Sequence, residues 1–309
     1  MSSRKVITEP LELPVHPWLV GSHTSADLDM KLRRIAQIAW FAREIHTTDF
    51  QLLRQKLPQS GSIRQAEADA ISDPPGSELV CDTIDFMSAS AADRLAGASA
   101  LVWGGEYLFS LAPMIRASFE SSLTGMWVLS NKVTGFERVQ RVHMIHFNDR
   151  ARLIASTPDK DFRDRVKRAQ KQARRQLTKQ YGASSLTFNA GGDALEAIDN
   201  VEFASFAEQC AELADRLGHD GKLWKRHYSM LSQLSHPNPA TSRMMLTNSR
   251  RYEMSPDAVV ALFEVAFFAY GQFLRHAAGY SCATAAEGDK LLLEWESLVE
   301  DAVPDFFDD

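Results

Sequence analysis

Cysteine is scarce in this chain, with three residues among 309. Cys81, Cys210 and Cys282 lie far apart and form no Cys-x-x-Cys pair. A disulfide framework and a cysteine zinc site both need paired or closely spaced cysteines, so the sequence argues against both. We therefore expect a reducing compartment, and we interpret the chain as cytoplasmic.

Long hydrophobic runs are also missing. The first ten residues contain no apolar signal segment. The longest apolar run, 258–274, is interrupted by Glu264 and Gln272 and is shorter than a bilayer requires. We interpret it as a buried core helix and expect no membrane partner.

The chain has no excess of positive charge, since its net charge is −6 and its pI is about 5.9. This argues against a dedicated nucleic-acid coat protein or a binder of anionic membranes, unless basic residues gather locally. Hydrophobic residues make up 45% and charged residues 24%, which is typical of a soluble globular protein. We assign no cofactor from the sequence.

Strand-like alternation of apolar and polar residues is absent over any useful length, whereas helical periodicity recurs along the chain. We predict an all-α fold, an irregular bundle of about eight helices with an extended N-terminal arm. The arm covers 1–22, and a single helical domain covers 23–309. The segment 183–200 is rich in Gly, Ser and Asn, so we interpret it as a loop, with a short helix around 194–198 as an alternative, and as the best place for a boundary. The helices are expected at 25–45, 77–103, 106–130 with a kink at Pro113, 136–155, 158–181, 201–217, around 224–236, 256–278 and 284–302, with a shorter helical piece at 50–57.

One polar stripe lies on the helix around 224–236. Tyr228, Ser232 and His236 follow one another at a spacing of four residues and share a helix face. A second polar pair, Arg116 and Glu120, lies on a strongly apolar helix at the same spacing. An unpaired buried charge is very costly, so we predict that the five residues form one buried, inward-facing network. A structural ion pair that fixes the helix register is the alternative for Arg116 and Glu120.

These residues carry a resemblance to a known family. An Arg-x-x-x-Glu helix followed by Tyr-x-x-Leu-Ser-x-x-x-His resembles an uncharacterised family of all-helical bacterial proteins. The resemblance covers about 106–280 and rests on Arg116, Glu120, Tyr228, Ser232 and His236, with Leu231 inside the motif. It implies a helical fold and a shared polar cluster but no reaction.

A second resemblance lies on the helix from 136 to 155. Arg138 and His143, and likewise Arg141 and His146, have a spacing that resembles HEPN ribonucleases, in which such pairs from two protomers cleave RNA. Histidine would act there as general acid or base and arginine would bind the phosphate. Valine follows each arginine, where the family has a polar residue. The resemblance implies a metal-independent ribonuclease acting as a homodimer.

The same helix offers a metal-binding alternative. His143, His146 and Asp149 lie on adjacent turns and could hold a metal in a helical-bundle oxidase. No Glu-x-x-His motif completes a di-iron site, so we assign no metal ligand. Partly exposed histidines on an amphipathic helix are the simpler interpretation.

The helix expected at 158–181 is strongly basic. Arg168, Lys171, Arg174 and Arg175 belong to this basic set, while the apolar stripe beside them is thin. A solvated outer face is one interpretation. Contacts with RNA phosphates, an acidic protein partner or a second copy of the chain are the others.

Two main hypotheses about function follow. The first is a binding protein that uses the polar cluster and the basic helix for a ligand or partner, in a stress-response or phage-defence setting. The second is the HEPN-type ribonuclease, and the metal-dependent bundle enzyme is a third.

Overall fold

A computed structural model describes residues 26–47, 61–70, 76–104, 110–130, 132–217, 221–236, 256–282, 289, 292–293 and 295–299. Helices make up most of these residues and the strands are short, so the predicted all-α class is confirmed. The arm at 1–22 and the helix expected at 50–57 lie outside the described residues. Of the helix expected at 284–302, residues 289, 292–293 and 295–299 are described and are helical.

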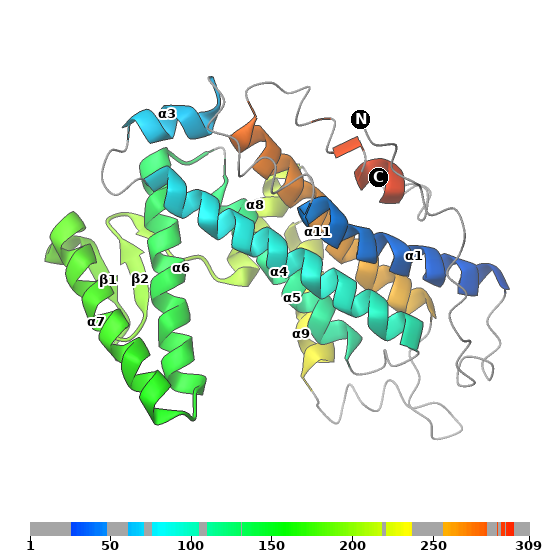
Figure 1. The fold of residues 1–309 in the computed structure, drawn as a ribbon, viewed down its shortest axis with the longest axis horizontal. Coiled ribbons are helices and arrows are strands. Elements are labelled where there is room, and N and C mark those ends of the chain that lie inside the picture. Colours follow the sequence, from blue (N-terminus) through cyan, green and yellow to red (C-terminus); the bar gives the residue numbers. More distant parts are fainter. Residues whose placement is uncertain are drawn as a thin grey trace.

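Four helices form the centre of the fold: α1 (Ala26–Ile45), α4 (Gly76–Gly104), α5 (Leu111–Val128) and α11 (Pro256–Ser281) (Figure 1). α4 packs along α1 and α5, and α11 packs against α5 and α1. Alanines on the buried faces of α1 and α4 let these helices approach closely, because a small side chain fits between packed ridges. Larger apolar residues of α5 and α11 fill the remaining core.

α11 supports the interpretation of a buried core helix. Residues 258–281 are long and apolar enough to cross a membrane by length and composition, but 61% of the most apolar window is buried inside the protein. Phe263, Phe267 and Phe273 are completely buried in the common core. Pro256 occupies the first position of the helix, as the sequence predicted.

α6 (Gly135–Ser156) and α7 (Lys160–Tyr181) pair at one end of the bundle (Figure 1). α6 starts at a capping box, in which the Thr134 hydroxyl accepts from the Glu137 N–H and the Glu137 carboxylate accepts from the Thr134 N–H. The Asp159 side chain caps α7 by accepting from Phe162 N. Both caps are local in sequence, so both starts lie within two residues of the predicted ones.

The prediction of a loop at 183–200 is wrong. The segment forms β1 (Leu186–Phe188) and β2 (Leu195–Ile198), which pair with β3 (Val201–Glu202) in an antiparallel sheet of order β1-β2-β3. Leu195 and Ile198 are fully buried, and the sheet packs against α6 and α7. The sheet therefore packs on α6 and α7, and the domain boundary suggested for this segment stays a prediction.

The remaining described helices cover the bundle. α3 (Ile63–Ala70) contacts α4 and α11, whereas α8 (Phe206–Leu217) and α9 (Gly221–Ser235) pack on each other and on α5. The predicted helix at 201–217 begins later, because 201–202 form β3 and 203–205 follow as a connection.

The start of α5 also differs from the prediction. The helix begins at Leu111, so Pro113 lies in its first turn rather than in its interior. Proline is tolerated in the first turn because the N–H groups there have no partner within the helix. The predicted kink at Pro113 is therefore wrong.

Candidate functional site

Four of the five predicted network residues meet where α5 faces α9, and we call them the Arg116 network: Arg116, Glu120, Tyr228 and His236. Arg116 Nε donates to Glu120 Oε1 at 2.8 Å, and Arg116 NH1 lies 2.9 Å from His236 Nε2. Arg116 NH2 donates to the Tyr228 hydroxyl at 3.2 Å, and that hydroxyl donates to Glu120 Oε1 at 3.1 Å. The guanidinium carbon also lies 5.5 Å from the centre of the Tyr228 ring.

The hydrogen bonds define the protonation states in the Arg116 network. A guanidinium has no acceptor atom, so His236 Nε2 must accept and His236 must be the neutral Nδ1–H tautomer. Burial alone lowers the pKa of Arg116, but the hydrogen bond and charge of Glu120, with help from Tyr228, raise it overall. Burial and the charge of Glu120 raise the pKa of Tyr228. The network thus contains a cation, a carboxylate, a neutral phenol and a neutral imidazole.

The Arg116 network is less buried than predicted. The side chains of Arg116 and Glu120 are 20% and 21% exposed, and His236 is exposed. Removing one partner of such a pair should cost nearer the ~1 kcal/mol of a surface pair than the ~3–5 kcal/mol of a buried one. Ser232 is half-buried, and within the described residues no hydrogen bond joins it to the network. Leu231, in contrast, is fully buried.

Glu120 and Tyr228 line a pocket of about 580 Å³, which we call the Glu120 pocket. Apolar and aromatic side chains form much of its wall, with Phe203 and Phe206 on the connection to α8 and at its start. The lining also includes three carboxylates and two guanidinium groups: Glu120, Asp149, Glu208, Arg94 and Arg152. A largely apolar cavity with a few polar groups in its lining is the usual form of a small-molecule site.

The Glu120 pocket offers no reactive thiol. Cys210 lies on α8 and is fully buried. Burial, reinforced by the charge of Glu120, raises the pKa of its thiol to about 12. Cys210 therefore stays protonated at neutral pH and serves as packing.

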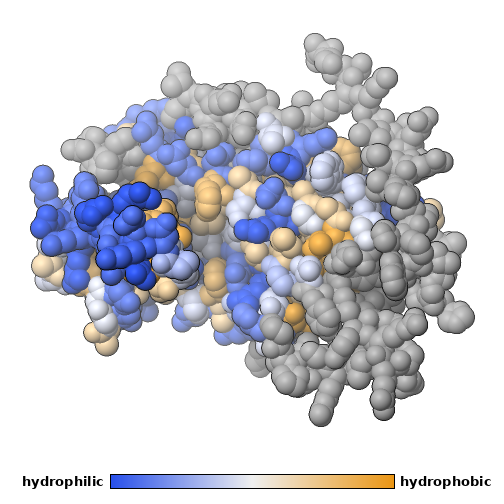
Figure 2. Space-filling view, turned by 60° about the horizontal axis from the view of Figure 1, so that its bottom comes forward, coloured by the Kyte–Doolittle hydropathy of each residue, from blue (hydrophilic) through white to orange (hydrophobic). Residues whose placement is uncertain are grey.

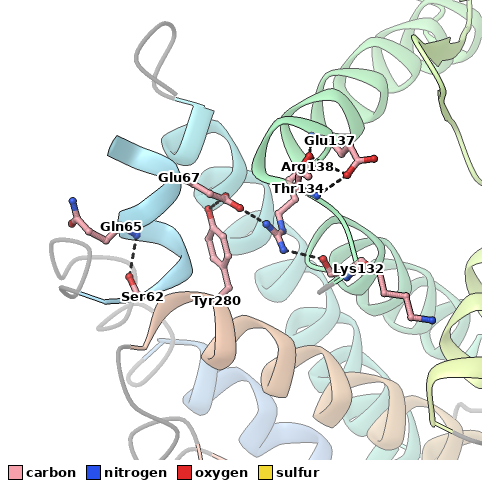
Figure 3. Close-up of polar contacts among 9 residues, drawn as sticks. Ser62, Gln65, Glu67, Lys132, Thr134, Glu137, Arg138 and Tyr280 are labelled. Carbon is pink, nitrogen blue, oxygen red and sulfur yellow. Dashed lines mark hydrogen bonds and ion pairs between the residues drawn. The ribbon is translucent and has the colours of Figure 1, made fainter. Parts of the chain in front are cut away.

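Arg138, a predicted ribonuclease residue, is held in the interior (Figure 3). Its NH1 group forms an ion pair with Glu67 of α3, and NH2 donates to the Ser130 carbonyl at 2.9 Å. Tyr280 of α11 donates to the other oxygen of Glu67 at 3.0 Å and places its ring under the guanidinium. The side chains of Arg138 and Glu67 are 5% and 9% exposed. In this arrangement Arg138 ties α3, α6 and α11 together.

Arg141, the other predicted arginine, is also engaged by the protein. Its NH1 group donates to the Trp127 carbonyl, and its guanidinium carbon lies 4.7 Å from the centre of the Trp127 ring. Neither arginine contacts His143 or His146 through a hydrogen bond within the described residues. The HEPN-type ribonuclease stays a prediction, and its two arginines have structural contacts in this fold.

His143 and His146 lie on α6, on the side that faces α4 and α7. His143 Nε2 is buried and has no hydrogen-bond partner in the described part of the chain, and its ring meets Tyr181 edge-on at 5.9 Å. His146 Nε2 lies 3.0 Å from the hydroxyl of Thr83 on α4. Asp149 lines the Glu120 pocket whereas the histidines line another, and no group of three potential ligands is close enough for a metal within the described residues. The three residues proposed for a metal site therefore do not converge.

The buried histidines predict an acid-sensitive stability. Burial, with smaller contributions from His146 and Arg150, lowers the pKa of His143 from 6.5 to about 4. Between these two pH values the His143 position binds a proton in the unfolded chain but not in the folded protein. The contribution of neutral His143 to the free energy of unfolding is therefore fully present above pH 6.5 and is lost as the pH drops toward 4. We expect His143→Leu to flatten this fall in urea titrations at several pH values. An unchanged pH dependence would contradict the assignment.

The predicted basic residues lie on the outer side of α7. Arg168, Lys171, Arg174 and Arg175 are all exposed. Figure 2 shows strongly hydrophilic side chains gathered at the end of the molecule where Figure 1 places α7. Arg174 differs from the others, because its guanidinium covers the Phe188 ring at 4.1 Å and donates to a carbonyl of the β1–β2 turn. Arg174 therefore binds to β1 and to the β1–β2 turn, whereas the other three residues face solvent.

Several residues of these sites carry no sequence motif. Glu67 and Tyr280 are far from Arg138 in sequence, and Thr83 is far from His146. Phe203 and Phe206 were placed inside a helix that began too early. The one sequence signal for the role of Glu67 was its position between two alanines in the short segment that forms α3.

No protein-family model, curated protein or solved structure matches this chain.

Proposed function

We propose that the chain is a small-molecule-binding protein whose site is the Glu120 pocket, with Glu120 and Tyr228 of the Arg116 network in its wall. The observation that carries this proposal is that Glu120 and Tyr228, two members of the polar network that joins α5 and α9, line a largely apolar cavity of about 580 Å³. A network that served only to fix the helices would not need to border a cavity. We propose a cytoplasmic location on the scarcity of cysteine.

The charges of the pocket favour a small organic cation with an aromatic or apolar body. Three carboxylates and two arginines line the cavity. Both hydrogen bonds described for Glu120 go to Oε1, so its second oxygen is available to a ligand donor. Phe203 and Phe206 would pack against the body of the ligand, and aromatic faces also attract cations.

We test the proposal with two probes of similar shape and opposite charge, 2-phenylethylamine and 3-phenylpropionate. Ligand-observed NMR titration should show saturable binding of the amine and little binding of the acid. Glu120→Gln should weaken amine binding at least about tenfold, because a charge-assisted hydrogen bond is lost. Glu202→Gln, which removes an exposed carboxylate that does not line the pocket, is the matched control.

The outcomes separate the hypotheses. Equal binding of both probes, or equal amine binding by the Glu120→Gln variant and the parent protein, would contradict a cation site at Glu120. In that case the Arg116 network would be only a structural contact between α5 and α9.

We propose a second binding role for the exposed face of α7. Arg168, Lys171 and Arg175 face solvent, and no ion pair engages them within the described residues. Such a face suits a polyanion, either RNA or an acidic protein, and its binding would weaken steeply with salt. The homodimer and the ribonuclease stay predictions.

A further inference from the structure

A second pocket lies between α4, α6 and α7 and has no part in the proposed cation site. Its volume is about 590 Å³, and we call it the His143 pocket. Its polar lining comes from the inner face of α6 and the last turns of α7: His143, His146, Arg150, Gln176, Lys179 and Gln180. Leu79, Phe147 and Leu177 supply an apolar wall.

The charge of the His143 pocket is positive. Arg150 and Lys179 both line it, and no carboxylate appears in its lining within the described residues. The hydrogen bond described for Arg150 goes to the His146 carbonyl at 3.2 Å, which leaves its charge without a carboxylate hydrogen bond. Asp82 and Asp149 act on His146 from nearby, but neither lines the pocket.

The histidines add hydrogen-bonding groups. The Thr83 hydroxyl donates its single proton to the Leu79 carbonyl at 2.8 Å, so toward His146 Nε2 it acts as acceptor. His146 thereby donates from Nε2 to Thr83. His143 Nε2 is buried and has no hydrogen-bond partner among the residues that the structure describes. His143 as a residue lines the pocket, and a buried polar atom without a partner is the usual sign of a group that a ligand or water satisfies.

We propose that the His143 pocket binds a phosphate group, either as free phosphate or as part of a nucleotide. Arg150 and Lys179 would pair with the phosphate oxygens, because guanidinium and ammonium groups are the common phosphate ligands. His143, with its proton on Nε2, would donate the third bond. The apolar wall would accept the organic body of a nucleotide.

The experiment is calorimetric titration of the full chain with inorganic phosphate, adenosine 5′-monophosphate and adenosine. Adenosine should not bind. Saturable binding of phosphate alone supports free phosphate as the ligand, and tighter binding of the monophosphate supports a nucleotide. Lys179→Gln and Arg150→Gln should each weaken binding at least about tenfold, because each removes a charge-assisted contact. Lys171→Gln, on the outer face of the same helix, should bind like the parent protein.

A spectroscopic measurement accompanies the titration. The bound phosphate should raise the NMR-determined pKa of His143, because a nearby anion stabilises the imidazolium. Absence of saturable binding by both phosphate probes overturns the proposal. Parent-like binding in both the Lys179 and Arg150 variants overturns it as well. Glu120→Gln should leave phosphate binding unchanged, so failure here is separate from failure of the cation site.

Discussion

Arg138→Ala is expected to lower the free energy of unfolding by about 3–5 kcal/mol, the usual cost of removing one partner of a buried ion pair. The substitution leaves the Glu67 carboxylate between α3, α6 and α11 with Tyr280 as its remaining described donor. Urea titration followed by circular dichroism measures the loss. A buried carboxylate that has lost its cation raises the free energy of the folded state, so the effect should be among the largest of any single substitution in the protein.

Two comparisons sharpen this prediction. Arg152→Ala breaks an ion pair with Asp149 whose side chains are 63% and 46% exposed, so it should cost only about 0–1 kcal/mol. Replacing both buried partners, with Arg138→Met and Glu67→Leu, should recover much of the loss because no charge stays buried. A loss below about 1 kcal/mol for Arg138→Ala would show that the pair contributes no more than a surface contact.

Gly125→Ala is expected to destabilise the protein by about 1–3 kcal/mol through overpacking. A methyl group at Gly125 of α5 would lie 2.8 Å from Cδ2 of Phe273 and closer still to its Cζ and Cε2 atoms. Phe273 is fully buried in α11, so its ring cannot turn out into solvent to relieve the contact. Thermal and urea unfolding of the variant measure the effect.

Gly97→Ala is the matched control for this close contact. Gly97 lies in α4, and its added methyl group would meet Met114 at an ordinary distance of 3.7 Å. Alanine favours a helix over glycine by up to about 1 kcal/mol, so Gly97→Ala should be neutral or stabilising. Equal effects of the two substitutions would mean that α5 and α11 pack less closely than described.

The sequence predicted the Arg116 network because local spacing contains most of the needed information. Arg116 and Glu120 share a helix face at a spacing of four residues, and Tyr228 and His236 share one at a spacing of eight. The need to satisfy polar groups on apolar helices then brings the two faces together. The degree of burial was not predictable, because it depends on where α9 ends and on what lies beside it.

The sheet was missed for a physical reason. β1 and β3 have three and two residues, too few to show an alternating pattern, and the pairing of β1 with β2 is irregular after Thr187. The β2–β3 turn places Asp199 at a positive φ of 52°, a conformation in which aspartate is tolerated. Glycine, serine and asparagine between the strands indicated turns correctly, but the strands themselves carried no signal.

The roles of Arg138 and Arg141 could not be read from their spacing to the histidines. Each arginine is engaged by a residue that lies far away in the sequence or on another helix, Glu67 for Arg138 and Trp127 for Arg141. A spacing motif on one helix describes which residues share a face. It does not describe which neighbouring element covers that face.

A crystal structure of the full chain soaked with 2-phenylethylamine tests the central claim most directly. The claim predicts Arg116 in contact with Glu120, Tyr228 and His236, the amine nitrogen within about 3 Å of a Glu120 oxygen, and the ring beside Phe203 and Phe206. An amine bound elsewhere in the protein, or an Arg116 side chain turned away from Tyr228 and His236, would contradict it.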